Sequence, residues 1–303
     1  MKRLIVAYLL LGILIPILLC ILLFIKVDRL QKELDQVQRQ IASQQSESTA
    51  GAEQTASAEA EAGQQAGGMQ ADNSLAKWQA EETEPDDGQK RKVYLTFDDG
   101  PSSNTDAILD ILKQYDVKAT FFVTGKPEEQ YKEMYQRIVE EGHTLGMHSY
   151  SHKYDEIYAS EEAFEEDLSR LQDFLYDTTG VWSHFYRFPG GSSNQVSTVD
   201  MSELAAYMQQ QDIYYLDWNV SSGDATGKKV KAQTLVDNVL TGVGKHQTAV
   251  VLLHDAANKN TTVEALPAII EEIQAMDDTV LLPVSDDMEF VQHLKLQQST
   301  AQQ

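Results

Sequence analysis

The chain of 303 residues contains a single cysteine, Cys20, which lies inside an apolar run near the N-terminus. The rest of the chain therefore has neither a disulfide bond nor a thiolate for catalysis. Lys and Arg are also scarce, since 24 of them stand against 47 Asp and Glu and leave a net charge of −23. This charge would repel a polyanion, so nucleic acid is excluded as a partner. The hydrophobic content of 42% can supply a core held together by burial alone, which is compatible with an extracellular location.

Residues 4–25 form an almost unbroken apolar run that is long enough to span a bilayer core. A cleaved signal peptide is one alternative, but its apolar core would be shorter, and the charged residues 26–29 follow here where small residues would be expected. A lipid-anchored cysteine is another alternative, but the bulky Leu19 precedes Cys20. We therefore predict an uncleaved transmembrane anchor over residues 1–26. Basic residues flank the run on both sides, so charge alone does not fix its orientation.

Two further segments separate this anchor from the rest of the chain. Residues 27–41 carry apolar side chains at spacings of three and four, which predicts a short helical stalk. The stalk is either a coiled coil that forms a weak oligomer or a single solvated helix. Residues 42–90 are rich in Ser, Gln, Ala, Gly and Glu and cannot bury enough apolar surface to fold. We predict a disordered linker there, which would give the following domain its reach.

From residue 91 to residue 297, apolar β-rich runs alternate with amphipathic helical stretches. This alternation predicts a parallel sheet, and the number of units favours a (β/α) barrel over the alternative of an open doubly wound sheet. Strands are expected at 93–97, 119–123, 143–148, 184–188, 213–218, 250–254 and 279–284. Helices are expected near 104–115, 128–141, 160–177, 199–210, 231–241 and 262–276, with a last short helix after residue 284.

Unusual polar residues fall at the C-terminal ends of the expected strands. In a barrel these ends converge on one face, where active sites are built. The residues concerned are Asp98, Asp99, His148, Arg187, Asp217 and His254. The sequence therefore predicts one polar site on the C-terminal face of the sheet.

Two pairs of residues, which include three members of this set, have the spacing of functional groups. The adjacent Asp98 and Asp99 point in opposite directions along an extended chain, but a turn beginning at Gly100 and Pro101 could bring both to one site with different roles. A solvated turn is the alternative for this pair alone. His148 and His152 are four residues apart and would lie on one face of a helical turn, a spacing that lets both imidazoles reach one metal ion. With Asp99 they would form a set of two histidines and one carboxylate, which is typical of a catalytic metal.

Five ordered segments together resemble the motifs of the polysaccharide deacetylases, carbohydrate esterase family 4. The segments are 96–100 (TFDDG), 148–152 (HSYSH), 187–191 (RFPGG), 217–219 (DWN) and 252–255 (LLHD). The resemblance covers roughly residues 92–284 and rests on the order and spacing of all five segments. It implies a distorted (β/α) barrel that binds a divalent metal.

The resemblance also assigns roles to single residues. It implies zinc, with Co²⁺ or Mn²⁺ as alternatives, bound by Asp99, His148 and His152. Asp98 would be the general base on metal-bound water, and His254 the general acid. Arg187 would hold Asp98, and Asp217 would orient and charge His254. The backbone N–H of Gly190 would bind the oxyanion, and Trp218 and Leu252 would line the pocket for the acetyl methyl group.

One departure from the family pattern concerns the third motif, which commonly runs Arg-Pro-Pro-Tyr. Phe188 and Gly190 replace the first proline and the tyrosine. The tyrosine side chain that usually forms a wall of the groove is therefore missing, which predicts a wider or differently lined groove. Tyr150 and Tyr154 are candidates for stacking on sugar rings, with packing in the core as the alternative. The loop 221–224 is expected to shape the groove and receives no role.

The leading functional hypothesis is a hydrolase that removes N-acetyl groups from the amino sugars of peptidoglycan. The anchor and the linker would hold it as a single-pass protein of the cell membrane, with an extracellular catalytic domain within reach of the wall. Chitin-like oligomers, a poly-N-acetylglucosamine exopolysaccharide and acetylated xylan are alternative substrates. A non-catalytic glycan-binding protein is the alternative from another class, but the presence of every catalytic motif residue argues against it.

Overall fold

The computed structural model describes residues 90–225 and 230–296 of the chain. The predicted anchor (1–26), the predicted stalk (27–41) and all but the last residue of the predicted linker (42–90) lie outside the described residues. In the part that the structure describes, no helix combines the length and the apolar character needed to cross a membrane.

Eight parallel strands form one sheet in the order β5-β4-β3-β2-β1-β7-β6, with β8 paired to β1. The first five strands are neighbours in chain order, and β7 and β6 continue on the other edge of β1. This is the strand order of a (β/α) barrel that is open between β5 and β6, and not the reversed order of a doubly wound sheet. The strands are β1 Arg91–Asp98, β2 Thr120–Thr124, β3 Thr144–Ser149, β4 Phe185–Tyr186, β5 Tyr214–Tyr215, β6 Val220–Ser221, β7 Thr248–His254 and β8 Thr279–Leu281.

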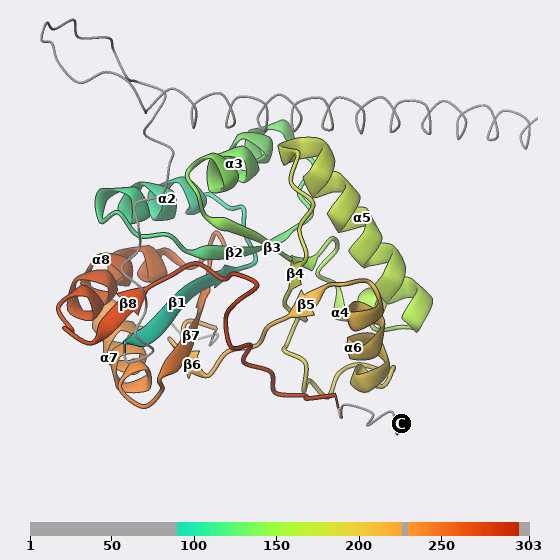
Figure 1. Cartoon of the computed structure of the whole chain (residues 1–303). Coiled ribbons are helices and arrows are strands. Elements are labelled where there is room, and N and C mark those ends of the chain that lie inside the picture. The colour runs from blue at the N-terminus through green and yellow to red at the C-terminus, as the bar shows by residue number, and fades with distance from the viewer. Residues whose placement is uncertain (1–89, 226–229, 297–303) are drawn as a thin grey trace, which may run out of the picture. The chain divides into compact units, whose positions relative to one another are not determined.

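Helices surround the strands on the outer side of this curled sheet (Figure 1). They are α2 Thr105–Gln114, α3 Glu129–Glu140, α4 Tyr154–Ile157, α5 Glu161–Thr179, α6 Met201–Gln210, α7 Ala232–Val243 and α8 Asn260–Gln274. In α8, for example, Leu266, Ile269 and Ile273 recur at spacings of three and four and are buried in the main core. That spacing places them on one face of the helix, which is why α8 packs on the sheet.

The strand β1 has a different core on each of its two faces. Leu95 and Phe97 belong to the main core under the helices. Tyr94 points the opposite way and belongs to a smaller inner cluster with Phe122 and Val250. Alternate side chains of a strand leave on opposite faces, so Thr96 and Asp98 share the inner face with Tyr94. The first predicted site residue, Asp98, therefore faces the inside of the half-barrel.

The segment after β8 does not form the last short helix that the sequence predicts. It is irregular, and its backbone is tied to the bottom of the sheet by bonds from Leu282 N to the Val93 carbonyl (3.0 Å) and from Val284 N to Thr120 Oγ1 (2.9 Å). Further along, the Val291 carbonyl accepts a bond from Asp217 N (2.8 Å). This C-terminal segment (residues 282–296) thus reaches the chain between β5 and β6, where the sheet is open. Tertiary bonds replace the helical ones that the amphipathic pattern had suggested.

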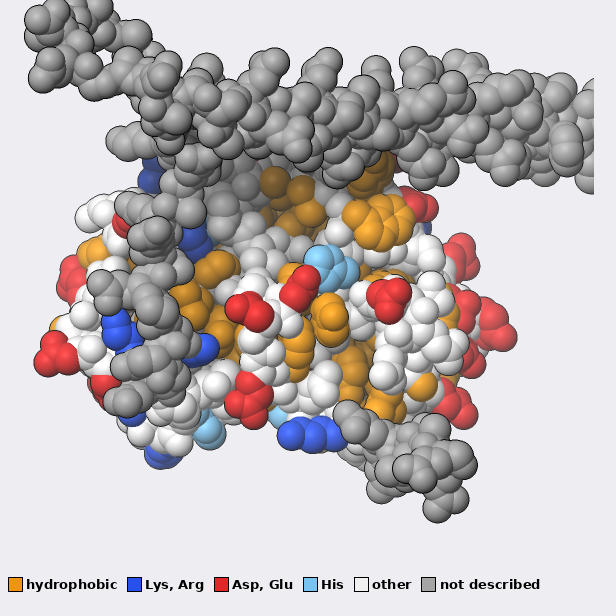
Figure 2. Space-filling model, in the orientation of Figure 1, with side chains coloured by type: hydrophobic (Ala, Val, Ile, Leu, Met, Phe, Trp, Pro, Cys, Tyr) orange, Lys and Arg blue, Asp and Glu red, His pale blue; other side chains and the backbone are white. Residues whose placement is uncertain are grey.

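Acidic side chains are more prominent than basic ones on the face of the domain that Figure 2 shows. Figure 2 shows them spread over the exposed face and along the edge where α5 lies in Figure 1, with fewer basic side chains between them.

Candidate active site

Asp98 ends β1 on the inner face and forms a buried ion pair with Arg187. Arg187 Nη1 lies 2.8 Å from Asp98 Oδ1, and both side chains are almost completely buried. The guanidinium also donates to Thr96 Oγ1 (2.7 Å) and to the carbonyls of Leu216 (3.0 Å) and Asp217 (3.0 Å). A buried charge needs such a full set of partners. The contact between Arg187 and Asp98 that the motif resemblance implies is present, and Asp98 Oδ2 stays open towards the site.

Asp99 reaches the same site because the backbone reverses at this residue. Its φ is 75°, in the left-handed region that residues other than glycine rarely adopt. An extended chain would have sent its side chain to the opposite face, and the left-handed turn brings it back beside Asp98. Strained backbone of this kind is common at active sites, although Asp116 and Asp212 have left-handed φ values outside this site.

His148 and His152 converge on Asp99 from the end of β3 and the loop after it. His152 Nε2 lies 3.2 Å from Asp99 Oδ1, and His148 Nε2 lies 3.7 Å from the same oxygen. His152 also has a left-handed φ, of 52°. The two candidate ligands Asp99 and His152 therefore both occupy strained backbone positions, whereas His148 lies within the regular strand β3. The helical turn expected for the pair is absent, and the loop brings the rings together instead.

The three residues fit a divalent cation by the chemistry of their atoms. His148 Nδ1 lies 2.6 Å from the Arg187 carbonyl, which can only accept, so Nδ1 carries the proton and a neutral His148 has its lone pair on Nε2. That lone pair faces carboxylate oxygens of Asp98 (3.9 Å) and Asp99 (3.7 Å). The His148 lone pair and these carboxylate oxygens are all acceptors, so a cation between them is needed to offset their repulsion. One ligand atom from each of Asp99, His148 and His152 lies within 4.8 Å of the others, compatible with metal–ligand bonds of about 2 Å.

A metal ligand must be free of the proton that occupies its lone pair. The surroundings favour this state for Asp99 and His148, but not for His152. Burial raises the pKa of Asp99, but the hydrogen bond with His152 and the charges of the nearby histidines outweigh it and hold the pKa below its usual value. Burial lowers the pKa of His148, which keeps the imidazole neutral. Burial also opposes protonation of His152, but the hydrogen bond and charge of Asp99 raise its pKa. A metal ion would take the place of that proton.

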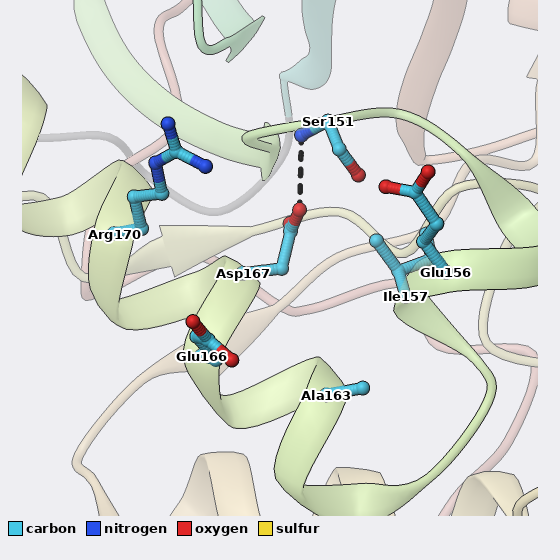
Figure 3. A pocket seen from close by; sticks show the side chains of 7 residues that line it. All are labelled: Ser151, Glu156, Ile157, Ala163, Glu166, Asp167 and Arg170. Atoms are coloured by element: carbon cyan, nitrogen blue, oxygen red, sulfur yellow. Dashed lines mark hydrogen bonds between the residues drawn. The ribbon is translucent and has the colours of Figure 1, made fainter.

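Asp167 on α5 holds the loop between the two histidines, a contact that the sequence did not reveal. Its carboxylate accepts hydrogen bonds from Ser149 Oγ (2.8 Å), Tyr150 N (2.8 Å) and Ser151 N (2.9 Å). Ser149 Oγ in turn accepts from His152 N (2.8 Å). Figure 3 shows Asp167 directed at Ser151 from the wall of a small polar pocket behind the loop. The strained backbone at His152 is thus fixed from α5.

His254 ends β7 beside Asp98, and its partner is Asp224. Asp98 and His254 are register partners in the β1–β7 pairing. His254 Nδ1 lies 2.8 Å from Asp224 Oδ1, and His254 N donates to Asp224 Oδ2 (2.8 Å). Burial lowers the pKa of His254, but the hydrogen bond and charge of Asp224 outweigh it, so the pKa is raised above its usual value. The pairing of His254 with Asp217 predicted from the sequence is wrong.

Asp217 instead joins the third motif to the C-terminal segment. It is fully buried, and it accepts hydrogen bonds from Ser192 N (2.8 Å) and His293 N (2.7 Å). The sequence does not indicate the correct partner, because the strand β6 has only two residues and leaves no recognisable pattern. Asp224 follows β6 as the other site residues follow their strands, so the rule that located them would have found it. The loop 221–224, to which no role was given, therefore supplies the partner of His254.

The remaining candidates lie on the loop of the third motif and near it. Gly190 has a φ of 80°, and among the described residues no acceptor faces its N–H. Trp218 packs on this loop, since a Cβ on Gly191 would lie 3.2 Å from Trp218 Cη2. Leu252 is almost completely buried in β7, next to β6. The structure thus places Trp218 against the loop that carries Gly190, and Leu252 on the same face of β7 as His254.

Comparison with known proteins gives the same assignment for this part of the chain. The polysaccharide deacetylase family profile matches residues 86–208. A peptidoglycan-N-acetylglucosamine deacetylase of Bacillus cereus is 33% identical over 62% of this chain and 67% of its own length. The polysaccharide deacetylase YheN of Bacillus subtilis, itself named as putative, is 32% identical over 61% of this chain, and the match spans 64% of YheN.

A solved structure extends the comparison to the fold. The catalytic domain of peptidoglycan N-acetylglucosamine deacetylase from Eubacterium rectale is 41% identical, with a TM-score of 0.64, over 68% of this chain and 93% of that domain. The residues that the family profile matches include Asp98, Asp99, His148 and His152 of the candidate site. Profile, sequence relatives and solved fold therefore agree, and the chain belongs to the polysaccharide deacetylase family.

Proposed function

We propose that this protein hydrolyses the N-acetyl groups of amino sugars in a polysaccharide, with the N-acetylglucosamine of peptidoglycan as its substrate. The observation that carries the proposal is the register pairing of Asp98 with His254 beside the cluster of Asp99, His148 and His152. A candidate base and a candidate acid thus flank a candidate metal site. Relatives named peptidoglycan-N-acetylglucosamine deacetylase support the choice of sugar.

A divalent metal, with zinc as the first candidate, would be held by Asp99, His148 and His152. When bound, the metal would polarise the amide carbonyl and lower the pKa of water towards about 7. Asp167 and the Arg187 carbonyl would orient the ligands, the first through the loop and the second through His148 Nδ1. Such outer contacts commonly fix the orientation of metal ligands.

The two proton transfers fall to Asp98 and His254. Asp98 Oδ1 is engaged by Arg187, which leaves Oδ2 to take a proton from the water that attacks the acetyl carbon. His254 Nδ1 is engaged by Asp224, which leaves Nε2 to give a proton to the nitrogen as the carbon–nitrogen bond breaks. Acetate and a free amino sugar result. The open N–H of Gly190 would donate to the oxyanion formed in between.

For the location, we propose that residues 1–26 anchor the protein in the cell membrane with the folded domain outside. The apolar run of residues 4–25 and a substrate that lies outside the membrane support this. A protease added to intact cells should then cut the linker and release the domain. Complete protection of the domain in intact cells, with cleavage after lysis, would show the opposite orientation.

Acetate release by the full-length protein tests the activity. Purified peptidoglycan, N-acetylglucosamine oligomers and acetylated xylan are incubated with the protein before and after chelation, and again after zinc is restored. We expect the highest rate on peptidoglycan, loss after chelation and recovery with zinc. A higher rate on chitin oligomers or xylan would change the substrate, and acetate from none of them would overturn the proposal. Full activity after rigorous metal removal would contradict the metal site.

A further inference from the structure

The space in front of Gly190 is occupied by the ring of Tyr154. A Cβ added to Gly190 would lie 3.2 Å from Tyr154 Cε1 and 3.4 Å from the Tyr154 hydroxyl oxygen. Tyr154 begins α4, directly after the loop that follows β3 and carries His152. A side chain at position 190 would therefore point at a ring that comes from the segment after the second motif.

The ring of Tyr154 lies beside the candidate metal site and is open to solvent. It packs edge-on against His152 (5.7 Å between ring centroids) and Tyr158 (6.0 Å). Tyr154 is 37% exposed, and among the described residues no partner bonds its hydroxyl. A tyrosine hydroxyl can donate a hydrogen bond as well as accept one. An exposed aromatic face with a free donor suits a sugar ring.

Tyr150, the other aromatic candidate in this region, is not available. Its ring lies under the guanidinium of Arg170, 3.8 Å from the centroid, and packs edge-on against Phe174 (6.0 Å). Its far side faces Gly125, where a Cβ would approach the ring to 2.4 Å. Tyr150 thus supports the loop from within the fold. Tyr150 therefore packs within the fold, whereas Tyr154 is exposed and remains a candidate for contact with a sugar ring.

We propose that Tyr154 forms the wall of the substrate groove beside Gly190 and contacts the sugar ring that carries the acetamide. The proposal rests on the proposed function and names a specificity residue for it. Gly190 is part of the arrangement, because a larger residue there would displace the Tyr154 ring. The wall residue Tyr154 therefore belongs to the segment next to the candidate metal ligands, and not to the loop that carries the candidate oxyanion donor Gly190.

Binding of an N-acetylglucosamine tetramer to the full-length protein, measured by calorimetry, tests this contact without requiring turnover. Tyr154→Ala should weaken the Kd at least about tenfold, and Tyr154→Phe, which keeps the ring, should stay within about threefold of the wild type. Tyr176→Ala is the matched control, because Tyr176 is an exposed tyrosine on α5 that contacts Trp182. Zinc affinity, measured by chelator competition, should be unchanged in all three variants. Equal Kd values for Tyr154→Ala and the wild type would overturn the proposal, and so would a loss of zinc affinity that explains the weaker binding.

A double-mutant cycle with Gly190→Ala tests the pairing of the two positions. The left-handed backbone at Gly190 and the approach to Asn194 Cβ (3.3 Å) penalise alanine in both backgrounds, whereas the tight contact with the ring exists only when Tyr154 is present. Gly190→Ala should therefore weaken tetramer binding more in the wild type than in Tyr154→Ala. Equal effects in the two backgrounds would contradict the shared site.

The same measurements separate this proposal from the proposed function. If tight tetramer binding depends on Tyr154 but no glycan releases acetate, the proposed activity is refuted and the proposed role of Tyr154 is supported. Acetate release and tetramer binding that are both insensitive to Tyr154→Ala would support the activity and refute the wall. Absence of tetramer binding by the wild type would overturn the wall whatever the activity.

Discussion

Asp224 accepts a hydrogen bond from Nδ1 of His254 over 2.8 Å, and a second oxygen of the same carboxylate accepts from the backbone N–H of His254. Thr262 Oγ1 donates to this carboxylate as well (2.9 Å). The imidazole is thus fixed in one tautomer, with Nε2 directed away from Asp224. Asp217, the partner expected from the motif pattern, contacts Ser192 and His293 instead.

Asp224→Asn should lower kcat/KM by about 10² or more and move the alkaline limb of the pH profile to lower pH. Protonated His254 is the active form, and the raised pKa keeps it protonated to higher pH. Without the charge of Asp224, burial dominates and the pKa falls, so the acid is lost earlier as the pH rises. The measurement is kcat/KM for a soluble oligomer between about pH 5 and pH 10. Asp217→Asn is the comparison, and its limb should stay where the wild-type limb lies. If Asp217→Asn shifted the alkaline limb and Asp224→Asn did not, the pairing of His254 with Asp217 expected from the sequence would be supported instead.

Asp98→Asn and His148→Ala should separate catalysis from metal binding. Asp98→Asn removes the proposed base and keeps a neutral partner for Arg187, so turnover should fall by at least about 10² while bound zinc remains stoichiometric. His148→Ala removes a candidate ligand and should lose both turnover and zinc. Elemental analysis of the purified variants and acetate release give the two readings. Near-normal turnover in Asp98→Asn would contradict its role as the base.

Asp167→Ala should weaken zinc binding by about tenfold to a hundredfold, although Asp167 is not a candidate ligand. The substitution removes the acceptors of Ser149 Oγ, Tyr150 N and Ser151 N, so the loop no longer holds His152 in its strained conformation. Chelator competition gives the affinity, and thermal unfolding shows whether the fold survives. Asp173→Ala removes an exposed carboxylate from the same helix and should leave the affinity unchanged. Equal affinities in the two variants would exclude a positioning role for Asp167.

Gly100→Ala should destabilise the fold by about 1–3 kcal/mol. A Cβ at this position would lie 2.4 Å from Asp255 Oδ2, and Asp255 is held in place by Ser102 Oγ (2.9 Å) and Thr105 Oγ1 (2.6 Å). The carboxylate cannot retreat without breaking those bonds. Chemical denaturation measures the free energy of unfolding, with Gly244→Ala as the control because its nearest contact would be 3.5 Å away. An undiminished free energy in Gly100→Ala would mean that the first-motif turn is looser than the contacts indicate.

Much of the fold follows from local pattern. The helices expected near 104–115 and 128–141 are present as α2 and α3, because their apolar spacing has no competing use. The short strands were harder to recognise. The run 213–218 is a strand only at Tyr214–Tyr215, and β6 was missed, because two-residue strands are defined by their neighbours in the sheet. The helix expected after residue 284 failed because backbone bonds to the sheet and to Asp217 hold that segment irregular.

The sequence by itself determined which residue types stand at the ends of the strands, and the five motifs identified the family that the comparisons show. Only the tertiary structure decided which of those residues meet. The left-handed backbone at Asp99 and His152, the pairing of Asp224 with His254 and the ring of Tyr154 against Gly190 depend on contacts between segments far apart in the chain or on turns that neighbouring segments hold in place. Residue type and spacing restrict the chemistry, but the direction of a side chain depends on backbone angles that distant packing selects.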